Sequence, residues 1–267
     1  MRSSFQNPYS NSYTHDLLSL GHEQYGDNTF LTQSLIHGQG ERKVKKGTLA
    51  AQHVHTSTSL ANQPVIKTLE FRKKVFNSDL SIWHKTKWAE NQQYFAACTG
   101  WRPNVPDVTL HAVIGDQDGH GPVLGVAHFR CSRHVRFGIG DALNKPGEVT
   151  WEEMRNVSRM LAKSNYEWQY TEMLEWNDIK DNIHPQIRRF KWQRTKTPDD
   201  GVENKLSLRN YRLTDQDSER VVAVFVARTL GNVRNRGEVR LFEELRPKVE
   251  AAVVLTCASI LEKLNRD

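Results

Sequence analysis

The chain ends in a segment, residues 245–267, whose centre carries no charge. No Asp, Glu, Lys or Arg occurs from Ala251 to Leu261, whereas charged residues gather on both sides of this window. In a helix, the apolar side chains of the window project in every direction, so the helix must be surrounded by protein or by lipid. The window of 11 residues is too short for a bilayer, which needs about 20 predominantly apolar residues. We therefore expect a C-terminal helix that is enclosed by the rest of the protein.

Upstream of this helix the chain reads as short extended runs separated by turn residues. Residues 107–114 alternate between apolar and other side chains, residues 115–122 are rich in Gly and Asp, and residues 123–129 read as a returning strand. This pattern is typical of a β-hairpin. Further strands are predicted over residues 65–76, 80–84, 186–195, 206–213, 220–227 and 238–242. Many short strands at roughly 8–12-residue spacing predict a closed or sandwiched antiparallel sheet.

A single helix that is apolar on all sides, in a mostly β chain, is most simply buried inside a curled sheet. About 20 helical residues at 1.5 Å each span roughly 30 Å, which suits the length of a small barrel. The sequence therefore predicts a mainly β fold of the α+β kind. Its expected form is a closed antiparallel β-barrel around the buried, hydrophobic C-terminal helix.

The N-terminal quarter of the chain differs in composition from the rest. Residues 1–64 are rich in Ser, Thr, Asn, Gln, Gly and His and contain few aliphatic side chains. Such a segment buries too little apolar area to offset its ordering entropy, so we expect a disordered polar tail. The barrel domain is expected to cover residues 65–267, with an insertion at residues 163–185.

The charge of the chain is moderately basic, with a formal net charge of +6 and a sequence pI near 9.2. This balance suits an anionic membrane surface or nucleic acid, and equally a solvated surface without a partner. The three cysteines are widely spaced, so neither a disulfide framework nor a cysteine zinc site is predicted. No apolar signal segment follows Met1 and no transmembrane span is recognised, which predicts a cytosolic protein.

A similarity to a known family lies in short segments spread along the chain. They are FKWQRT at residues 190–195, NYRL at 210–213, VVAVF at 221–225, AVVLT at 252–256, LEK at 261–263, SDL at 78–80, VAHF at 126–129 and RHVR at 133–136. Together these segments resemble fungal tubby-like proteins, which belong to the superfamily of tubby C-terminal, LURP-one and phospholipid scramblase proteins. The resemblance covers about residues 69–267.

This resemblance implies a barrel of about twelve strands around a central C-terminal helix, in agreement with the periodicity. Tubby proteins bind phosphoinositides through basic residues, and scramblases are linked to lipid movement. No tubby phosphoinositide site aligns with this sequence residue by residue, so the resemblance assigns no binding residue. The long polar N-terminus and the segment 163–185 also depart from the family pattern.

The candidate phosphate-binding residues are arginines on predicted strands. They are Arg130, Arg133, Arg136, Arg188 and Arg194. If these strands converge, the side chains form a phosphate-binding surface, because the guanidinium fork matches phosphate oxygens. The alternative is a solvated outer face, where basic side chains also protect sheet edges. A third basic cluster comprises Arg228, Arg234, Arg236 and Arg240. Nucleic acid is a less favoured partner, because no recognised reading motif accompanies the charge.

The sequence contains no recognised catalytic or metal-binding motif. It has no G-x-S-x-G, H-E-x-x-H or P-loop pattern. His53 and His55 could share one face of a strand, but no third ligand lies near them in sequence. We therefore expect no catalytic residue, no metal and no cofactor. An enzyme is the third alternative, and a deep polar pocket with His111 or His128 at its floor would favour it.

Two tryptophans, Trp168 and Trp176, lie in the segment 163–185 and are candidates for contact with a protein partner. Local packing onto the barrel is the alternative for both. The expected function is a non-enzymatic binding module for anionic phospholipid headgroups, such as phosphoinositides, in a cytoplasmic protein peripheral to membranes. The alternative function is an intracellular accessory or regulatory protein that acts through protein contacts of residues 163–185.

Overall fold

The computed structural model describes most of the chain from residue 60 onward. The described residues are 60, 63–74, 77–100, 102–114, 121–129, 134–158, 164–172, 185–200, 202, 207, 209–228 and 234–266. The expected disordered tail therefore lies almost entirely outside the described residues. The same holds for residues 173–184 of the expected insertion.

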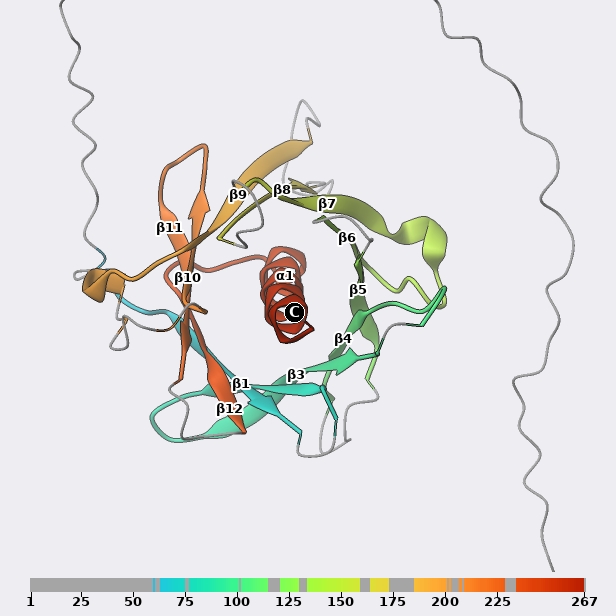
Figure 1. Cartoon of the computed structure of the whole chain (residues 1–267), viewed down its shortest axis with the longest axis horizontal. Coiled ribbons are helices and arrows are strands. Elements are labelled where there is room, and N and C mark those ends of the chain that lie inside the picture. The colour runs from blue at the N-terminus through green and yellow to red at the C-terminus, as the bar shows by residue number, and fades with distance from the viewer. Residues whose placement is uncertain are drawn as a thin grey trace, which may run out of the picture. The chain divides into compact units, whose positions relative to one another are not determined.

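Twelve antiparallel strands form a closed barrel (Figure 1). The strands are β1 (Lys67–Lys73), β2 (Leu80–Lys85), β3 (Glu90–Cys98), β4 (Val108–Ala112), β5 (Val123–Phe129), β6 (Val135–Ile139), β7 (Thr150–Asn156), β8 (Asn165–Glu172), β9 (Gln186–Arg194), β10 (Tyr211–Asp215), β11 (Val221–Ala227) and β12 (Asn235–Leu241). Each strand pairs with its neighbours in sequence, and β1 pairs with β12 to close the ring. Two short 3-10 helices, η2 (Pro146–Glu148) and η4 (Pro198–Asp200), lie in connections.

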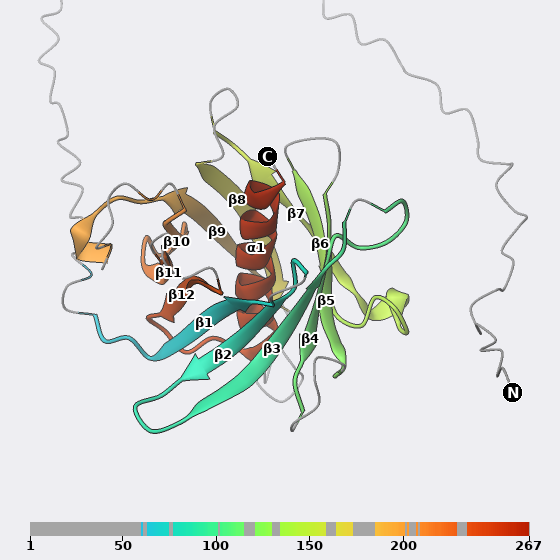
Figure 2. The same ribbon diagram turned by 60° about the horizontal axis from the view of Figure 1, so that its bottom comes forward.

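The helix α1 (Pro247–Asn265) runs through the middle of this ring (Figures 1 and 2). Every residue from Val249 to Glu262 is buried, and this includes the whole uncharged window. Pro247 stands in the first turn, where the N–H that it lacks would have no partner inside the helix. The closed antiparallel barrel around a buried C-terminal helix is therefore confirmed.

The inward faces of the strands carry the side chains that surround α1. On β9, Phe190 and Trp192 have no exposed surface, while their sequence neighbours are partly or fully exposed. The Trp192 indole N–H donates to the Thr256 hydroxyl of the helix at 3.0 Å. Period-two alternation thus presents one face of each strand to the helix and the other to solvent.

Part of the expected insertion is a strand of the barrel wall. Strand β8 occupies residues 165–172 and pairs with β9 along its whole length, from Asn165 opposite Gln193 to Glu172 opposite Gln186. Only residues beyond Glu172 remain as a candidate insertion. The sequence analysis did not recognise this strand because it is rich in polar and charged side chains, which obscured its aromatic alternation.

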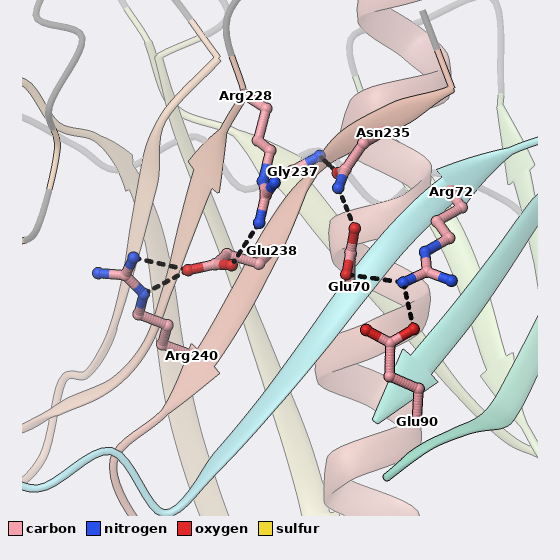
Figure 3. A network of polar contacts seen from close by, with 8 residues as sticks. All are labelled: Glu70, Arg72, Glu90, Arg228, Asn235, Gly237, Glu238 and Arg240. Atoms are coloured by element: carbon pink, nitrogen blue, oxygen red, sulfur yellow. Dashed lines mark hydrogen bonds and ion pairs between the residues drawn. The ribbon is translucent and has the colours of Figure 1, made fainter. Parts of the chain in front are cut away.

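Strands β1 and β12, which close the barrel, carry a network of charges on their outer face (Figure 3). Glu70 lies directly opposite Glu238, an arrangement of like charges that alone would be destabilising. Arg72 contacts Glu70 at 3.0 Å, and Arg240 contacts Glu238 at 2.6 Å. Asn235 also donates to Glu70. These cations and the amide offset the repulsion across the closing pair.

The alternating strand directions give the barrel two distinct ends. The α1 N-terminal end contains the β2–β3, β4–β5, β6–β7, β8–β9 and β10–β11 connections. The α1 C-terminal end contains the remaining strand connections. Contacts of the helix agree with this division: Lys67, at the start of β1, binds Glu250, and Lys263 donates to the backbone oxygen of His134 before β6.

Candidate anion-binding end of the barrel

The three described arginines among the expected phosphate ligands do not share one surface. Arg188 and Arg194 lie on the inward-facing side of β9 but at its opposite ends. Arg136 lies on the outer face of β6, between the buried Val135 and Phe137. Arg130 and Arg133 lie outside the described residues. The phosphate-binding role of this set stays a prediction.

Arg188 is already neutralised by carboxylates at the α1 N-terminal end. Its Nη2 atom lies 2.8 Å from Asp215 and 2.7 Å from Glu243. Burial lowers the pKa of Arg188, but hydrogen bonds to Glu243 and Asp215 raise that pKa above its usual value. A phosphate would have to displace one of these carboxylates. Arg188 is therefore less suited to bind phosphate than Arg136 or Arg194.

Arg136 is exposed and stacks on an aromatic ring. Its guanidinium carbon lies 4.5 Å from the centroid of Trp151, a cation–π contact. None of the carboxylates in the described part of the chain bonds to it. His128 packs on the same Trp151, and burial is the main cause that lowers the pKa of His128. Arg136 is therefore exposed without a bonded carboxylate in the described chain, although Glu153, which bonds Arg155, lies opposite it in the strand register.

Arg194 lies at the α1 C-terminal end and packs on Tyr211, with 6.0 Å between guanidinium and ring centroid. Burial raises the pKa of Tyr211, and the hydrogen bond from Arg194 opposes that shift. The hydroxyl of neighbouring Tyr166 is buried and has no hydrogen-bond partner. Burial is the main cause of the raised pKa of Tyr166, and the positive charge of Arg194 acts against it.

Two further arginines, Arg209 and Arg236, make this end a candidate anion site. Arg209 donates to the side chain of Asn265 at 3.2 Å and has no ion pair with the described chain. The Nε atom of Arg236 is buried without a hydrogen-bond partner. Burial lowers the pKa of Arg236, and the positive charge of Arg209 lowers it further, while Glu262 acts in the opposite direction. The two cations are therefore close enough to repel, and Glu262 bonds Arg266 instead.

The same end has an excess of positive charge in its described connections and in the last turn of α1. The cations are Lys74, Arg102, Lys196, Arg209, Arg228, Arg234, Lys263 and Arg266. The carboxylates are Asp79, Asp107, Asp199, Asp200 and Glu262. Part of this excess has a structural reason, because cations interact favourably with the partial negative charge at a helix C-terminus.

Arg266 illustrates that structural part. Its guanidinium bonds Asp107, Glu262 at 3.0 Å and the backbone oxygen of Thr99 at 2.6 Å. These bonds fix the end of α1 to the β3–β4 connection. Arg209 and Arg236 differ from Arg266 because neither bonds a carboxylate of the described residues. Sequence reasoning placed Arg236 in a general basic cluster and did not single out Arg209, since the chain order does not show which connections meet.

The helix start is held by a different polar group. Glu250 accepts hydrogen bonds from Lys67 and from the Tyr94 hydroxyl, both at 2.6 Å. Burial raises the pKa of Tyr94 well above its usual value, and the bond to Glu250 adds to this shift. This cluster connects β1 and β3 to the first turn of α1, so its role is structural.

The cleft formed by described residues contains neither of the histidines expected for an enzyme. A cleft of about 260 Å³ between β7, β8 and β9 is lined by side chains that include Glu152, Arg155 and Trp168, but by neither His111 nor His128. His111 instead lies with Nδ1 3.0 Å from the backbone oxygen of Gly121. Burial raises the pKa of the Glu152 carboxyl in the cleft, and bonds from Thr171 and Gln169 oppose the shift.

Trp168, expected as a partner contact, belongs to the core. Only 3% of its surface is exposed, and its ring stacks on Phe190 with 4.4 Å between centroids. For Trp168 the structure therefore shows the local packing that was the alternative to a protein contact. Its position on the inward face of β8 is the physical reason. Trp176 lies outside the described residues.

Comparisons with known proteins give no further assignment. The chain matches no protein-family model, no curated protein and no solved structure.

Within the described ranges, no three His, Cys, Asp or Glu side chains are placed to hold a metal ion. Among the described helices, none combines the length and the hydropathy needed to cross a bilayer.

Proposed function

We propose that the chain is a non-enzymatic module that binds phosphate groups of anionic phospholipids with the α1 C-terminal end of its barrel. The observation that carries the proposal is the pair Arg209 and Arg236. Arg209 lowers the pKa of Arg236, and no carboxylate of the described residues bonds to either guanidinium, so the pair is electrostatically complementary to an anion. Bidentate hydrogen bonds make phosphate a particularly good match for such groups.

A phospholipid surface fits the distribution of charge better than an enclosed small anion. The cations extend over several connections of one end, from Lys74 and Arg102 to Lys196 and Arg234. Juxtamembrane basic residues add roughly 1 kcal/mol each near an anionic bilayer. The similarity to tubby-like proteins supports the same ligand class, and the module would then act in the cytoplasm at a membrane surface.

Vesicle binding by a double variant tests this proposal. In Arg209→Gln with Arg236→Gln, we expect binding of phosphoinositide-containing phosphatidylcholine vesicles to weaken by about tenfold or more, since hydrogen bonds to charged groups contribute roughly 1.5–3 kcal/mol each. Co-sedimentation at low salt measures the change. Pure phosphatidylcholine vesicles provide the uncharged comparison.

The matched control removes two charges that are already paired. Arg155 lies 2.9 Å from Glu153, and Lys191 lies 2.9 Å from Glu167 on the outer wall. Arg155→Gln with Lys191→Gln changes the net charge equally, and we expect it to bind vesicles nearly as the wild type does. If both double variants lose the same vesicle affinity, the effect comes from net charge alone and not from the arginine pair. If the wild-type protein does not bind vesicles at low salt, the proposal is wrong.

A further inference from the structure

Exposed apolar side chains gather at the end of the barrel opposite the arginine pair. Of the eight exposed large hydrophobic residues in the described chain, six lie at the α1 N-terminal end. They are Val65, Ile66, Trp88, Ile114, Leu143 and Ile187. The other two, Val105 and Val157, lie at the α1 C-terminal end. Single exposed apolar residues are ordinary on a protein surface, whereas six at one end, among the residues that the structure describes, form a candidate contact surface.

These six residues lie on separate segments. Val65 and Ile66 precede β1, Ile114 follows β4, Leu143 lies between β6 and β7, and Ile187 begins β9. Stable protein interfaces use a well-packed, contiguous core with shape complementarity. Separate apolar loop tips better fit a bilayer interface, which is deformable and requires no matching shape.

Trp88 is the most exposed of the six, with 87% of its surface accessible. It lies in the turn of the β2–β3 hairpin, which reaches out beyond the neighbouring strands (Figure 2). The turn is closed by a backbone bond from Thr86 N–H to Ala89 O at 2.9 Å. The Thr86 hydroxyl donates to the same oxygen at 2.8 Å and accepts from Ala89 N–H at 2.9 Å. These bonds fix the backbone of the turn, from which the exposed indole projects.

The charge at this hairpin tip complements an anionic surface. Lys85 and Lys87 flank the turn, and both are exposed. The Nζ atom of Lys87 lies 5.0 Å from the centroid of the Trp88 ring. Glu90, opposite Lys85 in the strand register, is bonded to Arg72 at 2.7 Å. No carboxylate of the described residues forms an ion pair with either lysine. Tryptophan with neighbouring lysines is the combination enriched where proteins meet lipid headgroups.

We propose that the α1 N-terminal end of the barrel docks on an anionic phospholipid bilayer, with the Trp88 ring inserted at the interface and Lys85 and Lys87 among the headgroups. This inference rests on the proposed function in its choice of phospholipid, but it uses the opposite end of the molecule. The 19 residues of α1, at 1.5 Å each, separate the ends by about 28 Å. One flat bilayer therefore does not meet Trp88 and the arginine pair together when the helix stands upright on it.

Quenching by brominated phospholipid tests the insertion of Trp88 directly. Wild-type protein bound to vesicles of phosphatidylcholine and phosphatidylserine should lose tryptophan emission when the acyl chains carry bromine. Trp88→Phe should bind these vesicles nearly as well but show less quenching, because it removes the indole that the proposal places in the lipid interface. Unquenched emission from bound wild-type protein, or equal quenching in Trp88→Phe, would overturn the inference.

Variants that alter the tip measure its contribution to affinity. Lys85→Gln with Lys87→Gln should weaken binding about thirtyfold at low salt, because each lysine contributes about fivefold. Trp88→Ser should also weaken binding, whereas Val157→Ser at the other end should not. Circular dichroism and thermal melting of each variant confirm that the barrel is folded. Wild-type affinity in folded Trp88→Ser and in the double lysine variant would contradict the inference.

A soluble phosphate compound distinguishes the roles of the two ends. Inositol hexakisphosphate offers phosphate groups without a bilayer, and its binding should weaken in Arg209→Gln with Arg236→Gln but not in Trp88→Ser. If inositol hexakisphosphate does not bind while brominated lipid still quenches Trp88, the arginine site is contradicted and the insertion of Trp88 is supported. If inositol hexakisphosphate binds while quenching is absent, the inserted end fails and the arginine site stands.

Discussion

At the scale of single residues, a hydrogen bond connects strand β9 of the barrel wall to the middle of α1. Trp192 and Thr256 both have no exposed surface, and the indole N–H donates to the threonine hydroxyl at 3.0 Å. The hydroxyl in turn donates to the backbone oxygen of Val253 at 3.1 Å. Polar groups in such a dry site stabilise the fold only while they are paired.

Replacing this hydroxyl should expose the cost of an unpaired indole. Thr256→Val conserves shape but removes the acceptor, so we expect the free energy of unfolding to fall by about 1–3 kcal/mol. Urea denaturation of the full chain, followed by far-UV circular dichroism, measures the loss. Thr256→Ser retains the hydroxyl and should be less destabilised. A valine variant as stable as the wild type would show that the bond contributes nothing.

At the scale of elements, the pairing of β1 with β12 closes the barrel and depends on a glycine. Gly237 has φ of +147°, and a Cβ atom added there would lie 2.3 Å from the backbone oxygen of Val226. The register of β1 against β12 shifts beside it, between Phe71 and Arg72. Irregular positions of this kind accommodate glycine because other residues are strained there.

Gly237→Ala should therefore weaken the closure of the barrel. We expect a loss of at least about 1 kcal/mol in unfolding free energy, because both the backbone conformation and the space oppose a Cβ atom. Chemical denaturation provides the measurement. Gly147→Ala is the control, since nothing lies within 4 Å of a Cβ atom built there. Equal stability of the two variants would contradict this reading of the strand pair.

The sequence allowed prediction of elements with strong periodicity and missed those without it. The helix followed from its uncharged window, and the 107–129 hairpin followed from alternation and turn residues, as β4 and β5 show. Strand β8 was taken for insertion, although Tyr166, Trp168 and Tyr170 alternate on its buried face. That aromatic period of two was the available signal.

The candidate site was less predictable than the fold, because it depends on which segments meet in space. Arg136 and Arg194 were chosen from strand alternation, yet Arg209 precedes a strand and has no pattern around it. Its proximity to Arg236 arises from the β9–β10 connection, β12 and the end of α1 lying at one end of the barrel. Sequence alone does not give strand order, so it does not group these two cations.

At the scale of the whole molecule, the up-and-down strand order sends consecutive connections to opposite ends. In the part of the chain that the structure describes, one end combines a cation excess with Arg209 and Arg236, which bond no carboxylate, and the other combines exposed apolar tips with the Trp88 hairpin. The buried helix keeps the ends apart by about 28 Å. If both proposed surfaces bind phospholipid, one molecule can contact two vesicles at once.

Wild-type protein should therefore cluster vesicles that contain phosphatidylserine and phosphoinositide, which dynamic light scattering detects as larger particles. Arg209→Gln with Arg236→Gln, and separately Trp88→Ser, should each leave a single binding end and so bind vesicles without clustering them. Arg155→Gln with Lys191→Gln should cluster vesicles as the wild type does, because both ends are intact. Raised salt should dissolve the clusters, since screening weakens exposed charge contacts beyond about 8–10 Å. Clustering by either single-end variant would mean that one end, through self-association of the protein, suffices to join vesicles.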